Sequence, residues 1–290
     1  MKPFLGFEKI LTFAKTKPDL GIVGCKLIDG AGNFLPESKR GVPTPFVAFT
    51  KIMGLYKLFP KATLFTKYYA QHLDENETGK VDILVGAFLV VKKDLYLEIG
   101  GFDENCFMYS DDIDLSYMAL KKGKSNYYFH ETSVIHYKGE STIKDGTYMK
   151  RFQEAMNFFY KKHFRVSLLF SFFMKIGIVF FSLVKRIQGK PKPQIAPENY
   201  ILISENENLK NHLENQLSKS VAIQDHSFLF LEKNSNSEII FDQNYFDFKI
   251  IIQAFEEAKN KGFTFKIIPK SSHFMIGSNS SFDRGEIVKI

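Results

Sequence analysis

Residues 166–184 form an apolar stretch of nineteen residues whose only charge is Lys175, with basic residues on both sides. This stretch limits how the chain can fold, because a helix of about 20 apolar residues is long enough to cross a bilayer. A lysine at its centre opposes full insertion. We therefore expect a membrane-associated helix that either spans the bilayer or lies in its interface. A buried helix of a soluble domain is the alternative.

The apolar stretch separates two regions of ordinary globular composition. We expect residues 1–163 to form one domain, residues 164–188 the hydrophobic helix, residues 189–198 a linker, and residues 199–290 a second domain. In the last region, short β-type apolar runs alternate with stretches of helical periodicity, which is typical of a small α/β domain. No motif in that region indicates its role.

Composition narrows the choice of partner. The formal net charge of +7 would suit nucleic acid, anionic lipid or a phosphorylated substrate. No nucleic-acid-binding motif accompanies the dispersed lysines, so we expect no nucleic acid partner. Cys25 and Cys106 stand far apart, which argues against a disulfide framework and against a zinc site. The first residues lack the apolar core of a secretory signal, and we expect none.

The beginning of the first domain reads as a helix followed by a strand. Apolar residues recur at helical spacing over residues 7–15, and the apolar run at 21–28 predicts a buried strand that ends in a glycine-containing turn at 29–32. Residues 42–73 then alternate aromatic and lysine side chains. This segment is predicted either to contact a membrane surface or to form an ordinary packed helical hairpin.

Residues 81–91 are almost entirely apolar, with Gly86 and Ala87 at their centre. Such a run predicts a single strand buried on both faces. Asp94 is predicted to cap the short helix that follows, which a glycine pair ends. Two further short strands are predicted at residues 127–129 and 133–137.

Three carboxylates gather where the next helix is predicted to begin, at Asp111, Asp112 and Asp114, and that helix should end at Gly123. In their structural interpretation, the Asp111 side chain caps the start of the helix and the Asp114 side chain bonds back to the Asp111 backbone. The helix dipole would favour all three charges. They also have a chemical interpretation, because paired carboxylates serve general acid–base catalysis.

The motifs around this cluster resemble family 2 glycosyltransferases of the rhamnosyltransferase-like kind. Members of that family show a Gly-Ala at the end of a strand, a Gly-Gly-Phe-Asp-Glu turn, an aromatic pair, an acidic pair with a further Asp, and a later His and Ser. Here these elements are Gly86-Ala87, residues 100–104, residues 107–109, Asp111-Asp112 with Asp114, and His136 with Ser141. All five follow in order within residues 82–141.

The resemblance implies roles for individual residues. It makes Asp112 the base that deprotonates the acceptor hydroxyl in an inverting transfer, with Asp111 raising its proton affinity or holding the acceptor. It also implies substrate-binding and metal-binding residues, each with a structural alternative in packing, helix capping or hydrogen bonding. The substrate-binding residues are Gly86, Ala87, Tyr109 and Asp114, and the metal ligand is His136.

The same resemblance implies a GT-A-type mixed α/β sheet with flanking helices that is only partial in this chain. The family's nucleotide-binding half and its Asp-x-Asp ligands for Mg²⁺ or Mn²⁺ have no match before Gly86. We expect an N-terminally truncated or split enzyme rather than a degenerate one, with a separate donor-binding chain as one partner. This chain alone is therefore expected to be inactive.

The expected partners are a nucleoside diphosphate sugar, a lipid-linked or cell-envelope glycan acceptor and the membrane surface. The expected location is the cytoplasmic face of the bacterial inner membrane. The alternative is a non-catalytic, membrane-associated binding or scaffold protein derived from a glycosyltransferase. Replacing Asp112 by Asn would separate the two, because only the enzyme needs that carboxylate.

Overall fold

A computed structural model describes residues 5–59, 62–106, 108–137, 146–164, 196–225, 236–279 and 285–290. The chain divides into two compact units. Unit 1 comprises Met1–Lys26, Pro36–Thr132 and Asp145–Lys192, and unit 2 comprises Leu27–Leu35, Ser133–Lys144 and Pro193–Ile290. The second unit therefore also takes two segments from the first half of the chain, whereas the predicted domains were contiguous.

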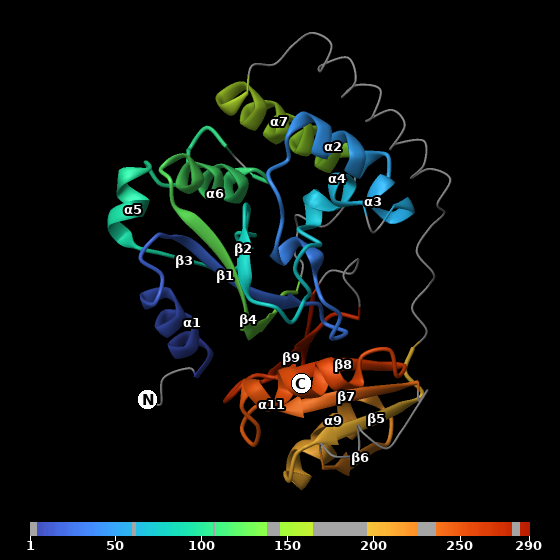
Figure 1. Cartoon of the computed structure of the whole chain (residues 1–290). Coiled ribbons are helices and arrows are strands. Elements are labelled where there is room, and N and C mark those ends of the chain that lie inside the picture. The colour runs from blue at the N-terminus through green and yellow to red at the C-terminus, as the bar shows by residue number, and fades with distance from the viewer. Residues whose placement is uncertain are drawn as a thin grey trace. The chain divides into compact units, whose positions relative to one another are not determined.

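The first sheet has the strand order β2-β4-β1-β3 (Figure 1). Strand β1 (Leu20–Ile28) is buried at every position and pairs antiparallel with β3 (Leu89–Val91). On the other side, β2 (Gly79–Val81) pairs antiparallel with β4 (Ser125–Ile135). Helix α1 (Leu5–Lys15) precedes β1, as predicted, and buries Ile10 and Ala14.

The predicted strand at 81–91 is wrong as a single element. Strand β2 ends at Val81, Ile83 forms an isolated bridge with Arg40, and the chain turns at Gly86 and Ala87 before β3 begins. The reason is a tertiary contact: the Gly86 N–H donates to a side chain of another element, Asp112, instead of to a neighbouring strand. Apolar content alone could not reveal this turn.

Two other predicted elements are also corrected. The two short strands expected at 127–129 and 133–137 are one strand, β4. Its polar residues have partners within the fold: the His130 N–H donates to Thr78 Oγ1, and the Thr132 hydroxyl donates to the Gly6 carbonyl. Asp94 does not cap α5 (Lys93–Glu98): the N-cap is Lys92, and Asp94 lies in the first turn, where a carboxylate still favours the helix dipole.

Three helices of unit 1 share one apolar cluster. Helix α2 (Pro45–Ile52) contributes Ala48, α6 (Asp111–Lys121) contributes Ile113, and α7 (Gly146–His163) contributes Phe159. A short 3-10 helix, η1 (Pro36–Ser38), comes before α2. After α2, the chain continues through three short elements, α3 (Leu55–Leu58), α4 (Thr63–Thr66) and η2 (Lys67–Tyr69). This packing places the start of α6 beside the loop that leads into α2.

Unit 2 is built on a second sheet with the order β10-β9-β8-β7-β5-β6. Its parallel part consists of β5 (Asn199–Ile203), β6 (Val221–Gln224), β7 (Ser237–Asp242) and β8 (Phe263–Ile268). An antiparallel edge follows, with β9 (Phe274–Gly277) and β10 (Glu286–Lys289). The predicted α/β character is confirmed, although β6, β9 and β10 were not predicted.

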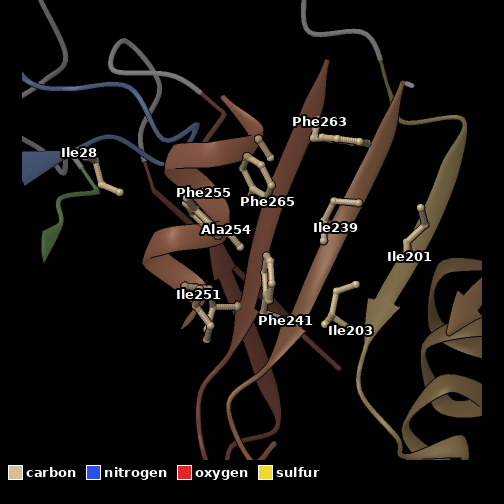
Figure 2. Packing of buried hydrophobic residues seen from close by; sticks show 12 residues of the cluster. Ile28, Ile201, Ile203, Ile239, Phe241, Ile251, Ala254, Phe255, Phe263 and Phe265 are labelled. Atoms are coloured by element: carbon tan, nitrogen blue, oxygen red, sulfur yellow. The ribbon is translucent and has the colours of Figure 1, made fainter. Parts of the chain in front are cut away.

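Both faces of the second sheet are covered by helices. Alternate strand residues such as Phe241 and Phe265 pack against α11 (Phe248–Ala258), where the ring of Phe255 stacks on Phe265 with centroids 4.3 Å apart (Figure 2). The intervening residues, such as Leu202, pack with α9 (Glu207–Leu217). Ile28, at the end of β1, belongs to the cluster on the α11 face.

The turn after Ile28 is held closely within unit 2. The Asp29 carboxylate accepts hydrogen bonds from the backbone N–H groups of Ala31 and Asn33, as predicted for a turn at 29–32. Gly32 has φ 80°, and a Cβ there would lie 2.1 Å from the Phe255 carbonyl oxygen. A glycine is therefore required at this position for both conformation and space.

We predict that Gly32→Ala destabilises the protein by at least about 2 kcal/mol, because it adds a backbone clash to the cost of a left-handed residue. The matched control is Gly54→Ala. Gly54 also has positive φ, 69°, but nothing lies within 4 Å of its missing Cβ. Urea unfolding followed by circular dichroism should show a clearly larger loss for Gly32→Ala, and equal losses would contradict the contact with Phe255.

Within the described ranges, no helix combines the length and the apolar character that a membrane crossing requires. Apart from Phe164, the predicted hydrophobic helix at 164–188 lies outside the described residues, as does most of the predicted linker at 189–198. In the described part of residues 42–73, Phe46, Leu58 and Phe59 are exposed apolar side chains.

Candidate functional site

Asp112 is a buried carboxylate in the first turn of α6. Its Oδ2 atom accepts two hydrogen bonds, from the Arg40 guanidinium at 2.7 Å and from the Gly86 backbone N–H at 3.0 Å. Its Oδ1 atom is buried and has no hydrogen-bond partner among the residues that the structure describes. Buried oxygens are nearly always hydrogen-bonded in folded proteins, so this orphaned oxygen marks a position prepared for another group.

Gly86 and Ala87 form the exposed turn opposite Asp112. A Cβ at Gly86 would lie 3.3 Å from the Asp112 Cβ, which is tighter than ordinary packing allows. The glycine thus lets the turn approach the carboxylate and donate to it. The structure brings Gly86 and Asp112 together, whereas substrate binding by Gly86 and Ala87 stays a prediction.

Arg40 is the neighbour of Asp112 that sequence reasoning missed. One guanidinium nitrogen donates both to Asp112 and, at 3.2 Å, to the Leu84 carbonyl. Burial opposes the charge, but Asp112 and Tyr68 outweigh it and raise the pKa of Arg40. Arg40 lies 72 residues from Asp112 in sequence, and no motif links them. The sequence holds no local signal for this contact, because nothing around Arg40 distinguishes a buried arginine from an exposed one.

Asp111 lies beside Asp112 at the helix start and is half-buried. Burial, and next the charge of Asp112, raise the pKa of Asp111. The charge of Asp112 therefore acts on Asp111, whereas the like-charge effect of Asp111 on Asp112 stays a prediction. Asp111 is not the N-cap: that position is Ser110, whose hydroxyl donates to the Ala155 carbonyl of α7 instead of capping α6. The N-terminal capping predicted for Asp111 is wrong for this reason.

Tyr109 precedes the acidic pair with φ 72°, a left-handed conformation that is uncommon for a residue with a side chain. Such conformations cost about 1–3 kcal/mol and concentrate where a loop must present groups in a fixed direction. The backbone at Tyr109 thus turns directly into the helix start. Its contact with an acceptor sugar stays a prediction.

Asp114 lies deeper, with 1% of its surface exposed. Lys162 Nζ donates to its Oδ2 at 2.9 Å, and His163 Nε2 donates to its Oδ1 at 2.5 Å. Burial lowers the pKa of His163, although Asp114 opposes this. Both oxygens of Asp114 therefore hold the end of α7 against α6, and a substrate contact would have to displace one of these bonds.

Lys162 also donates to Asp103 of the Gly-Gly-Phe-Asp-Glu turn, at 2.6 Å. This bond and those from Asn105 lower the pKa of Asp103 to about 2. A lowered pKa in the folded state adds stability above the unfolded value near 4, and that stability is lost as pH falls towards 2. Because solvent reaches this pair, the contribution is small.

We predict that Lys162→Met raises the pKa of Asp103 towards its ordinary value and reduces the acid sensitivity of stability between about pH 4 and 2. The measurement is a carboxylate NMR titration, together with urea midpoints at several pH values. Lys122→Met, which removes an exposed pair with Glu98, is the control. An unchanged Asp103 titration would show that Lys162 does not hold it in solution.

His136 belongs to unit 2, where its backbone N–H donates to the Ile28 carbonyl. Its role as a metal ligand stays a prediction. In the described ranges, no group of three His, Cys, Asp or Glu side chains could hold a metal ion. The acidic pair of unit 1 does not fit a divalent ion either, because Asp112 is already engaged by Arg40.

Comparisons with known proteins give one kind of relative. N-acetylglucosaminyl-diphospho-decaprenol L-rhamnosyltransferases from two strains of Mycobacterium tuberculosis are 28% identical to this chain over 138 residues, which are 48% of the chain. This partial homology supports a glycosyltransferase family. The match spans 44% of those relatives, so the chain covers less than half of their length. No protein-family profile matches the sequence. No solved structure is significantly similar.

Proposed function

We propose that this chain takes part in the inverting transfer of a sugar from a nucleoside diphosphate sugar to a lipid-linked or cell-envelope glycan acceptor. The observation that carries the proposal is the carboxylate of Asp112. Its Oδ2 is fixed by Arg40 and Gly86 while its Oδ1 is buried without a described partner. The relatives' name, which includes a diphosphate-linked lipid acceptor and a transferred rhamnose, supports this substrate class.

In the proposed reaction, the acceptor hydroxyl lies at Asp112 Oδ1. The hydroxyl oxygen bonds to the anomeric carbon of the donor sugar while the bond from that carbon to the diphosphate breaks, and Oδ1 takes the hydroxyl proton. The products are the glycoside, the nucleoside diphosphate and protonated Asp112. Attack from the face opposite the leaving group inverts the anomeric centre.

The remaining parts of the proposal rest on resemblance. Asp111 is proposed to hold the acceptor beside the base, and Gly86, Ala87 and Tyr109 to line the acceptor side. A divalent ion, Mg²⁺ or Mn²⁺, would neutralise the departing diphosphate, with ligands that the described residues do not assemble. The donor-binding half is proposed to come from a separate or longer chain. The proposed site of action is the cytoplasmic face of the inner membrane.

A complementation assay tests the proposal without requiring the chain to be active alone. Membranes from a strain lacking the gene are incubated with a nucleoside diphosphate [¹⁴C]rhamnose, with and without the purified protein. We expect label in extracted lipid-linked product to fall in the deletion membranes and to return when protein is added. Equal incorporation in wild-type and deletion membranes, for rhamnose and for other common donor sugars, would contradict a role in transfer.

A further inference from the structure

Arg40 holds one oxygen of Asp112 and leaves the other open. Its guanidinium nitrogen bridges Asp112 Oδ2, at 2.7 Å, and the Leu84 carbonyl, at 3.2 Å. The Gly86 N–H adds a second donor to the same Oδ2. Two donors on one oxygen fix the rotation of a carboxylate, because both its side-chain torsions are then determined. The orphaned Oδ1 is therefore presented in a single direction.

We infer that Arg40 is the positioning residue of this site, which selects Oδ1 of Asp112 as the atom that receives the acceptor proton. The inference rests on the proposed function and names a residue that the resemblance did not assign. Arg40 acts through Asp112 and is not itself given a contact with substrate.

A role in stability alone accounts poorly for this pair. The side chains of Arg40 and Asp112 are 11% and 10% exposed, so both are largely desolvated. Desolvation offsets much of the attraction in such a pair, and an apolar pair of similar volume is often as stable. Arg40 Nε is also buried without a hydrogen-bond partner in the described part of the chain. Orientation is what a planar guanidinium adds beyond charge.

Contacts with neighbouring residues hold Arg40 in place. Tyr68 on η2 interacts with Arg40, and Lys51 on α2 lies 3.7 Å from the centre of the Tyr68 ring. Asp111 is the other charged neighbour of Asp112. Arg40 also pairs with Ile83 through its backbone, which fixes its Cα beside the turn at Gly86. These contacts hold the guanidinium where Asp112 needs it.

The test compares Arg40→Met, Arg40→Lys and the surface control Arg151→Met in the complementation assay over a range of pH. For Arg40→Met we expect the acidic limb of the pH–rate profile to move to higher pH by about one pH unit or more, because a neighbouring cation favours the ionised form of a carboxylate. Its maximal rate should fall about 100-fold through misorientation. Arg40→Lys should return the acidic limb to its wild-type pH but should not restore the maximal rate, because an ammonium group lacks the planar set of donors of a guanidinium. Arg151→Met should match wild type.

A double variant gives a further test of the positioning role of Arg40. If Arg40→Met does not fold, Arg40→Lys is combined with Asp112→Asn. An orienting role predicts that Arg40→Lys lowers the rate in wild type but not in the Asp112→Asn background. Folded Arg40 variants that keep the wild-type acidic limb and rate within about threefold would overturn the inference. An added loss in the Asp112→Asn background would do the same.

Failure of the proposed function would be recognised separately. If wild-type protein restores no transfer, the proposed reaction fails. The effect of Arg40 can then still be read in purified protein, by the NMR titration of the Asp112 carboxylate carbon. A titration midpoint that rises in Arg40→Met, with circular dichroism unchanged, supports control of Asp112 by Arg40. An unmoved midpoint in a folded variant overturns it.

Discussion

Asp112→Asn should reduce sugar transfer by roughly 10²- to 10⁴-fold, which is the usual contribution of a general base. An amide has nearly the shape of a carboxylate and keeps an oxygen that can accept from Arg40 and Gly86. It has no basic atom to take the acceptor proton at Oδ1. We therefore expect the fold to be retained while the chemical step fails, measured as label incorporated into lipid-linked product by deletion membranes.

The matched control for this variant is Asp94→Asn, which changes an exposed carboxylate in the first turn of α5. It makes the same chemical change at a helix start far from any proposed role, and should transfer as wild type does. Full transfer by a folded Asp112→Asn protein would rule out Asp112 as the base. Asp111, with its raised pKa, would then be the next residue to test.

The second large effect is expected on stability. Asp114→Ala should lower the free energy of unfolding by about 3 kcal/mol, because it leaves His163 and Lys162 without their buried partner. His163 is 1% exposed at its side chain and Lys162 30%, so the histidine bears most of the loss. Urea unfolding followed by circular dichroism measures this change.

Asp103→Ala provides the comparison for Asp114→Ala. It removes the other, more exposed carboxylate that Lys162 contacts. Because solvent compensates an exposed charge, we expect a loss below about 1 kcal/mol. If Asp114→Ala were as mild as Asp103→Ala, the contact between α6 and the end of α7 would not be maintained in solution.

Much of the fold could be predicted where local periodicity and turn chemistry agree. Helix α1, strand β1 and the turn begun by Asp29 follow from helical spacing, an apolar run and an Asx side chain. Helix α6 likewise begins at its carboxylates, as their dipole preference suggests. In these elements the residues that decide the structure are neighbours in sequence.

Elsewhere, distant contacts determine the outcome. The run at 81–91 is broken because Gly86 bonds to Asp112, 26 residues away. The partner of Asp112, Arg40, is 72 residues away, and a buried arginine is indistinguishable from an exposed one in a single sequence. Conversely, motif order identified Asp111 and Asp112 as the acidic pair, but it could not reveal that Asp114 faces α7.

The discontinuity of unit 2 has a consequence for biosynthesis. Ile28 is synthesised well before its core partners, because Ile201 and Phe265 follow on the order of 170 residues or more later. A nascent chain leaves the ribosome N-terminus first, so Ile28 stays without its apolar cluster until the strands that carry those partners have been synthesised. The core of the second unit therefore forms only after β5 to β8 have been synthesised, later than its local helices can form. For the same reason, a fragment starting at residue 199 would expose the surface that Ile28 covers and would be prone to aggregate.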